Sequence, residues 1–381
     1  MKANSHRALL VADAHIKRRT WRNSPLLTGD ASASLDRLSE WLEGQTDRPD
    51  TLIMAGDWFD DNLPRPSDLE DSLMFQRRFR NVWGIRGNHD TALPSPAMLD
   101  AAGEGPGDGR DVRLLENTVL EPFGPSGTIV AGVTGAEGRD AALARLSELS
   151  ETLRSADASR RLVLVLHLAF RHSMGLDGVW WLETEDVARL FPGRPVTVLC
   201  GHIHTRTTVH SRDGLVTVHV PGSPYPTSSQ QMGLPCLATC VDLDTGELED
   251  VPCDVRRYAR CGLDEAREVL DRLESPGQAL RLPPCLRVVC TSETLDSVRA
   301  LAGELAGRAV VIPDILQDGQ TDSEDDGMDG PHGDLTSMED AVEACTDSEE
   351  LRRLCLKLLR SNDPLGEVSG WLDEWQVRRV Q

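Results

Sequence analysis

The sequence predicts an α/β fold built on two sheets, followed by a smaller α/β module and a helical C-terminal segment. Three observations support this prediction. Short apolar runs recur within the first 204 residues, and each is followed by Asp, Asn or His. Helical stripes separate these runs, and a further strand–helix–strand pattern occupies residues 262–315. A chain of 381 residues with 39% hydrophobic content can bury the cores that this arrangement needs.

Five apolar runs are typical of buried strands, because they are short, rich in β-branched residues and bounded by polar segments. They cover residues 8–12, 51–55, 81–85, 162–166 and 196–199. The helices expected between them are marked by Leu35, Leu38, Trp41 and Leu42, by Leu69, Leu73, Phe75 and Phe79, and by residues 141–153 and 184–190. Asp30 is a plausible N-cap of the first of these helices.

The remainder of the chain divides by pattern. Residues 215–220 and 236–243 alternate, and with the turn at Thr245-Gly246 they are expected to close the second half of a two-sheet sandwich. The small module comprises a strand at 286–290, a helix at 294–305 and a strand at 309–312. We therefore predict a first domain at 1–255, a second at 256–315, an acidic disordered linker at 316–335 and a helical partner-binding tail at 336–381.

Composition restricts the class of protein. The net charge is −22, but 14 acidic residues lie between Asp314 and Glu350, where there is no Lys or Arg. The nine cysteines are scattered without a Cys-x-x-Cys pair, which favours reduced core residues in a cytoplasmic protein. No run approaches the roughly 18 apolar residues of a membrane helix, and none resembles a secretory signal, so no membrane association is expected.

Polar motifs follow the five predicted strands. They are Asp13-Ala-His15, Gly56-Asp57-Trp-Phe-Asp60, Gly87-Asn88-His89-Asp90, His167 and Gly201-His202-Ile-His204. Ligands of open α/β sheets bind beyond the carboxyl ends of the strands, so these side chains are expected to meet. Each residue alone also has a structural explanation, such as a hydrogen-bonded histidine or a turn cap. Five such placements together favour a site for two divalent metal ions beside a phosphate ester.

The residue types suggest individual roles. Carboxylate, imidazole and amide ligands without thiolate suit Mn²⁺, Fe or Zn²⁺, and Mn²⁺ is the ion that we expect. Asp57 is the natural bridging ligand, because one carboxylate can span two ions roughly 3.5–4 Å apart. His89 is the candidate general acid for the leaving oxygen, and Asp90 is its expected orienting partner. Asp60 is expected to support the metal ligands from behind.

Basic residues cluster near the motif loops. Lys17, Arg18, Arg19 and Arg22 directly follow the first motif, and we predict that they contact DNA. A solvated surface without a partner is the alternative for any one of them.

The five motifs resemble, in order, the D-x-H, G-D-x-x-D, G-N-H-D, H and G-H-x-H blocks of the calcineurin-like metallophosphoesterase superfamily. The resemblance implies a metallophosphoesterase sandwich flanked by helices. It implies one ion held by Asp13, His15, Asp57 and His204, and a second held by Asp57, Asn88, His167 and His202. His89 would be the catalytic histidine.

Within that superfamily the chain most resembles the SbcD-type DNA repair nucleases. The similarity rests on Gly56-Asp-Trp-Phe-Asp60, on Pro221-Gly-Ser-Pro-Tyr225 and on the small module, where such proteins carry a capping domain. The chain departs from the family where Ile16-Lys17 follows the first motif. It departs again where Tyr225-Pro-Thr-Ser-Ser-Gln replaces the acidic and aromatic residues usual after Pro-Gly-Ser.

Three functions remain open from the sequence. The first is a metal-dependent DNA exo/endonuclease that works with an SbcC-like coiled-coil ATPase, with homodimerisation left open. The second is a stand-alone phosphoesterase that acts on small phosphodiesters or phosphoproteins. The third, a DNA-end scaffold with a vestigial site, is disfavoured by the intact ligand set. The helical tail favours the first function, because an enzyme of small molecules needs no such extension.

Overall fold

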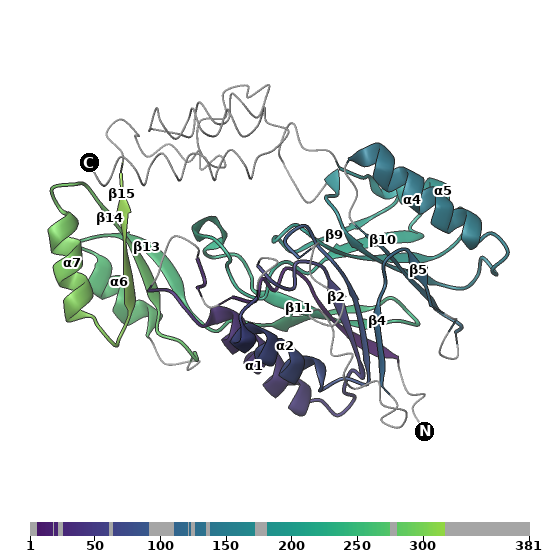
Figure 1. Ribbon diagram of the computed structural model, residues 1–381. Coiled ribbons are helices and arrows are strands. Elements are labelled where there is room, and N and C mark those ends of the chain that lie inside the picture. Colours follow the sequence, from purple (N-terminus) through teal and green to yellow (C-terminus); the bar gives the residue numbers. More distant parts are fainter. Residues whose placement is uncertain are drawn as a thin grey trace, which may run out of the picture. The chain divides into compact units, whose positions relative to one another are not determined.

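The computed structural model (Figure 1) describes residues 6–17, 19–21, 26–60, 64–90, 110–120, 122, 126–134, 138–171, 181–274 and 280–316. The chain divides at residue 318 into two units, and every element described below belongs to the first. The predicted linker, beyond its first residue Leu316, and the predicted tail lie outside the described residues.

The first sheet has six strands in the order β12-β11-β1-β2-β3-β4. Four strands are parallel: β1 (Arg7–Val11), β2 (Thr51–Ala55), β3 (Asn81–Ile85) and β4 (Asp111–Leu114). An antiparallel hairpin of β11 (Leu237–Asp242) and β12 (Leu248–Pro252) extends the sheet beside β1. The register pairs Val11 with Met54 and Ala55 with Ile85. The carboxyl ends of β1, β2 and β3 therefore meet at one edge, as the sequence predicted.

The second sheet also has six strands, in the order β5-β6-β7-β8-β10-β9. They are β5 (Thr118–Val119), β6 (Ile129–Val133), β7 (Leu162–His167), β8 (Val196–Gly201), β9 (Thr207–His210) and β10 (Val216–Val220). The central four strands are parallel, and the edge strands β5 and β9 are antiparallel to their neighbours. His167 pairs with Gly201, so the carboxyl ends of β7 and β8 also coincide.

Three apolar cores hold the sandwich together. Leu10 and Ile53 of the first sheet meet Val163 and Leu199 of the second in the central core. The outer face of the first sheet is covered by α1 (Asp30–Glu43) and α2 (Pro66–Gln76), and that of the second by α4 (Arg139–Thr152) and α5 (Thr184–Leu190) (Figure 1). All four helices were predicted from the sequence, the first two from the spacing of their apolar residues. The α/β sandwich flanked by helices is thus confirmed.

One expectation about the sandwich is wrong. Residues 215–220 join the second sheet as β10, but the hairpin of β11 and β12 extends the first sheet instead. Both faces of β11 are buried, because Ala238 and Cys240 face the outer core beneath α1, while Val241 faces the central core. The alternation of apolar residues could not show which sheet the hairpin joins, because a strand in either sheet of the sandwich can be buried on both faces.

A three-stranded parallel sheet forms the second module, in the order β13-β14-β15. Its elements are β13 (Tyr258–Gly262), α6 (Ala266–Leu273), β14 (Cys285–Cys290), α7 (Leu295–Glu304) and β15 (Val310–Ile315). Both helices pack on one face, against Leu286, Val288 and Val311. At one end of the opposite face, Tyr258, Cys285 and Val310 cluster with Trp21 and Leu27, which precede α1.

A buried ion pair joins the module to the sandwich. Asp30 accepts hydrogen bonds from Arg256 Nε at 3.0 Å, from the hydroxyl of Tyr258 and from that of Thr20. Asp30 was expected to cap α1, but Gly29 occupies the N-cap position and no side chain caps that end. Asp30 does not cap the helix because its carboxylate binds the guanidinium of Arg256, which lies far away in the sequence.

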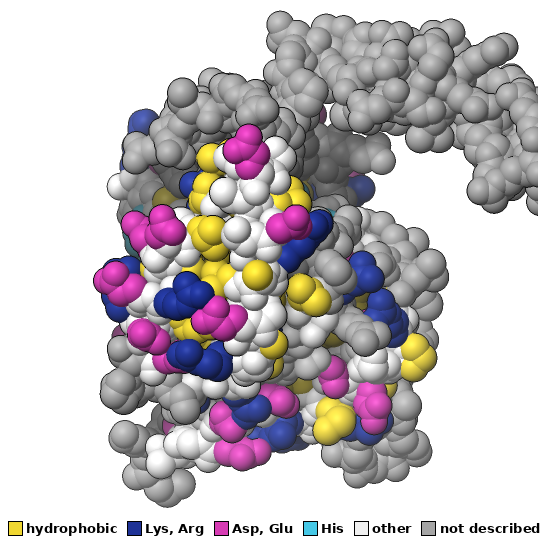
Figure 2. Space-filling view, turned by 90° about the vertical axis from the view of Figure 1, so that its left-hand side faces the viewer, with side chains coloured by type: hydrophobic (Ala, Val, Ile, Leu, Met, Phe, Trp, Pro, Cys, Tyr) yellow, Lys and Arg dark blue, Asp and Glu magenta, His cyan; other side chains and the backbone are white. Residues whose placement is uncertain are grey.

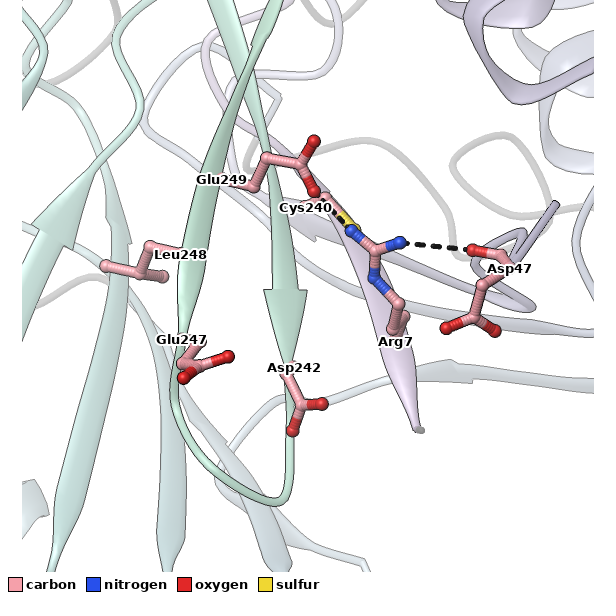
Figure 3. A pocket seen from close by; sticks show the side chains of 7 residues that line it. All are labelled: Arg7, Asp47, Cys240, Asp242, Glu247, Leu248 and Glu249. Atoms are coloured by element: carbon pink, nitrogen blue, oxygen red, sulfur yellow. Dashed lines mark hydrogen bonds and ion pairs between the residues drawn. The ribbon is translucent and has the colours of Figure 1, made fainter. Parts of the chain in front are cut away.

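Two further parts of the described surface can be seen in the figures. Figure 2 views the side that carries the module, where acidic, basic and hydrophobic side chains are interspersed. A depression of about 400 Å³ lies at the end of β1 away from the motifs, and there Arg7 binds Glu249 and the backbone oxygen of Asp47 (Figure 3). Its lining residues are Arg7, Asp47, Cys240, Asp242, Glu247, Leu248 and Glu249.

Two expectations from composition can be compared with the fold. The seven cysteines in the described part of the chain are all buried and free, as predicted for reduced core residues. Among the described helices, none combines the length and apolar character that crossing a membrane requires.

Candidate metal centre

The loops that follow β1 and β2 lie side by side and are strained. The N–H of Asp13 donates to Gly56 O at 3.2 Å, and that of His15 donates to Asp57 O at 2.9 Å. The φ angles of Asp13, His15, Asp57 and His202 are 51, 38, 48 and 90°, which is left-handed backbone. Each such residue costs of order 1–3 kcal/mol and persists only where the surroundings impose it. Here the strained backbone turns four of the predicted ligands toward a common point.

Two motif glycines are required by close approach. A Cβ at Gly87 would lie 2.0 Å from Asp57 Oδ1, and a Cβ at Gly56 would lie 2.2 Å from His167 Nδ1. Gly56 also has φ of +85°, which side chains rarely adopt. The glycines therefore make room for the side chains of Asp57 and His167, in addition to forming turns.

One group of predicted ligands surrounds the end of β1. His15 Nε2 and His204 Nε2 lie 3.1 Å apart. His204 Nε2 is 3.7 Å from Asp13 Oδ1, and His15 Nε2 is 3.7 Å from Asp57 Oδ2. Asp13, His15 and His204 offer atoms that all lie within 4.8 Å of one another, so one ion can contact all three.

A second group shares Asp57 with the first. His167 Nε2 lies 3.2 Å from Asp57 Oδ2 and 3.1 Å from Asn88 Oδ1. Asn88 Oδ1 is in turn 3.0 Å from His202 Nδ1. Asp57 Oδ2 thus stands between the two groups, which is the position of a bridging carboxylate. The structure brings together all seven residues that the sequence selected as ligands.

Burial and charge make this cluster suited to cations. Burial raises the pKa of Asp13 to about 7, helped by the charge of Asp57, although His167 opposes this shift. Burial alone would raise the pKa of Asp57, but the hydrogen bond and charge of His167 bring it below its usual range. Burial also lowers the pKa of His202 to about 4 and that of His204 to about 3. His167 differs, because despite burial the hydrogen bond and charge of Asp57 raise its pKa to about 9, so it must lose a proton to bind an ion. Carboxylates, imidazoles and an amide oxygen form a donor set that fits divalent ions.

The ring of His89 is oriented by a backbone oxygen and not by the carboxylate of Asp90 that we expected. Its N–H donates to Asp57 Oδ1 at 2.9 Å, and its ring Nδ1–H donates to the backbone oxygen of Asp60 at 2.8 Å. Asp90 accepts instead from the backbone N–H groups of Gly87 and Trp58, each at 2.7 Å. The prediction that Asp90 orients the His89 ring is therefore wrong. Asp90 ties the third motif loop to the second, because it lies buried between their backbones.

The carboxylate of Asp60 faces the back of a ligand, as expected. Its Oδ1 lies 3.4 Å from His15 Nδ1 and accepts from Lys17 Nζ at 2.8 Å. Only 13% of the Lys17 side chain is exposed, so this placement does not fit the predicted contact with DNA. Arg19 is exposed, whereas Arg18 and Arg22 lie outside the described residues.

The sequence did not predict the two residues whose hydroxyl groups hold the loop after β1 in place. The hydroxyl of Ser223 donates to Asp13 O at 2.8 Å, and that of Tyr225 donates to His15 O at 2.7 Å. Both carbonyls belong to residues with left-handed backbone. The only signal was the Pro-Gly-Ser segment, which was noted for its resemblance and not for these contacts.

Residues 6–206, more than half of the chain, match the calcineurin-like phosphoesterase family. The chain belongs to this family. It is accordingly a metallophosphoesterase-type enzyme, and the family uses divalent metal ions that the clusters around Asp57 can hold. No curated protein matches the sequence significantly.

Several solved structures are similar to this chain at low identity. The protein TT1561 of Thermus thermophilus is 17% identical, with 66% of this chain and 100% of that chain covered and a TM-score of 0.39. The phosphopantetheinyl hydrolase of Mycobacterium tuberculosis is 16% identical, with coverages of 65% and 96% and a TM-score of 0.38. GAP50 of Plasmodium is 12% identical, with coverages of 65% and 88% and a TM-score of 0.41.

Proposed function

We propose that this metallophosphoesterase is a DNA exo/endonuclease that hydrolyses phosphodiester bonds and acts with an SbcC-like coiled-coil ATPase. The chemical part rests on the convergence of the ligand residues around Asp57. Two bound ions, with Mn²⁺ the ion that we expect, would supply a hydroxide nucleophile and neutralise the phosphate. The substrate and partner parts rest on features outside this cluster.

His89 is the residue that we assign to the leaving group. Its Nδ1–H is committed to the carbonyl of Asp60, which fixes the ring plane and makes Nε2 the nitrogen that can carry a transferable proton. Its backbone is tied to Asp57, so the ring sits beside the bridging carboxylate. A positioned acid of this kind typically contributes 10²- to 10⁴-fold to the rate.

The observation that carries the substrate assignment is the face of the module sheet opposite its helices. Tyr258 and Cys285 of this face pack near Trp21, in the segment that follows the first ligand motif. The next row of the same face carries Arg260 and Arg287, which both bind the single carboxylate of Asp314. These two arginines are the basic residues that we propose a polyanion longer than one phosphate would contact beyond the site.

Partner binding is proposed from the sequence alone. The tail at 336–381 carries an apolar stripe of Leu351, Leu354 and Leu358 behind an acidic linker. Such a stripe suits packing in a groove of another protein, and the base of a coiled coil offers one. The tail lies outside the described residues, so this proposal depends on its sequence pattern.

The alternative, a phosphoesterase of small phosphodiesters or phosphoproteins, is favoured by one observation. Lys17 was expected to contact DNA, but its ammonium binds Asp60 inside the cluster. Together with the net charge of −22, this reduces the cationic surface near the metal centre.

Hydrolysis of linear duplex DNA and of a chromogenic phosphodiester in Mn²⁺ distinguishes the two functions. The double variant Arg260→Gln/Arg287→Gln should weaken DNA binding, and the slope of log affinity against log salt should fall by about one for each lost contact. Hydrolysis of the small phosphodiester should be unchanged. The matched control is Arg267→Gln on α6, which faces Glu304 on the helical side of the module. A wild-type protein that hydrolyses only the small compound would favour the alternative.

A further inference from the structure

His204 is held from behind by two side chains of the segment after β10. Its Nε2 points toward Asp13 and His15, as described above. Its Nδ1 lies 3.0 Å from Thr227 Oγ1 and 2.6 Å from Gln231 Nε2. Gln231 ends the short 3₁₀ helix Ser229–Gln231, so its side chain starts from a defined turn.

Thr227 and Gln231 both contact Nδ1 of His204, and this ring can bind a cation through Nε2 only when one of them accepts from Nδ1–H. Thr227 Oγ1 can accept from Nδ1–H while donating to Gln231 Oε1 at 3.1 Å. Gln231 Oε1 also accepts the backbone N–H of Thr227 at 2.8 Å. In this orientation the amide N–H of Gln231 is directed at Nδ1. When the amide is rotated, its oxygen accepts from Nδ1–H and leaves the lone pair of Nε2 for a cation, so the rotated orientation is the one that binding of an ion selects.

At the second metal position, the ring of His167 is oriented by the main chain. His167 Nδ1–H donates to the backbone oxygen of Ala55 at 2.8 Å. A backbone acceptor persists whatever side chain occupies the position. One histidine of each position can therefore be compared: His167 is oriented by the main chain, whereas His204 is oriented by Thr227 and Gln231.

We propose that Thr227 and Gln231 are positioning residues that set the affinity of one metal position through His204, and that this position can be weakened separately from the other. The inference rests on the proposed ligand set and is independent of whether the substrate is DNA. Thr227 lies in the segment where this chain departs from the family after Pro-Gly-Ser, and Gln231 directly follows that segment.

The test is Mn²⁺ binding to the full-length protein, measured by calorimetry and by metal counting after chelation and dialysis. Gln231→Leu should weaken one of two sites by about 10- to 100-fold, as is typical when the partner of a ligating histidine is lost. The other site should keep its wild-type affinity. Gln231→Glu should restore much of the loss, because its carboxylate can accept from Nδ1–H. The neighbouring Gln230, which is exposed, provides the matched control Gln230→Leu.

Three results of the Mn²⁺-binding experiment would contradict the inference or the ligand set on which it rests. Wild-type affinity at both sites of Gln231→Leu would overturn the inference, and so would an equal loss at both sites in a variant with an unchanged melting temperature. If Gln231→Leu does not fold, Thr227→Val replaces it, since valine keeps the shape of threonine and removes the acceptor. A wild-type protein that binds no pair of ions would instead refute the ligand set on which the inference rests.

Discussion

The buried histidine His219 should make this protein less stable in mild acid. His219 lies on β10, is fully buried, and bonds through Nδ1 to Thr208 Oγ1 at 2.8 Å and through Nε2 to Thr239 Oγ1 at 2.7 Å. Thr208 belongs to the second sheet and Thr239 to the first, so this ring links the two halves of the sandwich. Burial, with a smaller effect from the charge of Arg206, lowers the pKa of His219 from 6.5 to about 4.

The size of the effect follows from this pKa. Between pH 6.5 and about 4 the unfolded chain binds a proton at this residue that the folded chain does not, so stability falls as the pH is lowered through this window. Below the folded-state pKa both states are protonated and the loss levels off. A difference of about 2.5 pH units at 1.36 kcal/mol per unit amounts to about 3 kcal/mol. This loss is large, because the free energy of unfolding of a typical domain is only about 5–15 kcal/mol.

Urea unfolding of the wild type and of His219→Gln, at about pH 7 and about pH 5, isolates this contribution. The variant is less stable at neutral pH, because it loses bonds to the threonines, but it should lose about 2 kcal/mol less than the wild type on acidification. His210→Gln, on the neighbouring strand and exposed, should behave like the wild type. If the wild type and His219→Gln lose equal stability between these pH values, the reasoning about burial is refuted.

The remaining predictions concern the metal centre and the tail. His89→Ala should keep both ions but lose about 10²- to 10⁴-fold in turnover, because an acid is removed and no ligand is; loss of metal would contradict its assigned role. Asp57→Asn should bind at least one ion fewer by elemental analysis, since the bridging charge is gone, and two ions at full occupancy would exclude bridging. Lys17→Met should reduce hydrolysis of DNA and of a small phosphodiester alike, by about 10-fold, because Lys17 holds Asp60 behind His15; a loss confined to DNA would make Lys17 a substrate contact. Deletion of residues 336–381 should leave small-substrate hydrolysis intact and abolish copurification with the ATPase, and a truncated protein that retains the ATPase would refute the docking proposal.

Much of the fold could be predicted because buried parallel strands are apolar on both faces. The runs at 51–55 and 81–85 coincide to the residue with β2 and β3. β4, with a single buried residue in the pattern Asp111–Leu114, gave no such signal. β13 was missed for the same reason, since Cys261 is its one fully buried residue. A strand at the edge of a sheet forms because it pairs with a neighbouring strand that is distant in the sequence, and its own residues carry little apolar pattern.

The ligands could be predicted because their chemistry restricts the residue types, whereas their supports could not. The acceptor for the His89 ring is a backbone oxygen 29 residues away, and the partner of Asp30 is 226 residues away. Lys17 next to a metal motif resembles a phosphate-binding residue in sequence, and only the fold reveals the carboxylate that holds it. Contacts of this kind depend on which loops the sheets bring together, and a local pattern does not contain that information.

The same cluster that suits two ions is unfavourable for folding without them. Asp13 and Asp57 are buried at the ends of strands, and four ligands have left-handed backbone, so the site has both electrostatic and conformational costs. The central core between the sheets offsets these costs, because it fixes the ends of β1, β2, β7 and β8 whether or not ions are bound. Hydrogen bonds from Ser223 and Tyr225 hold the first loop in its strained form. Packing and hydrogen bonds from outside the ligand set therefore hold the ligand-bearing loops in place.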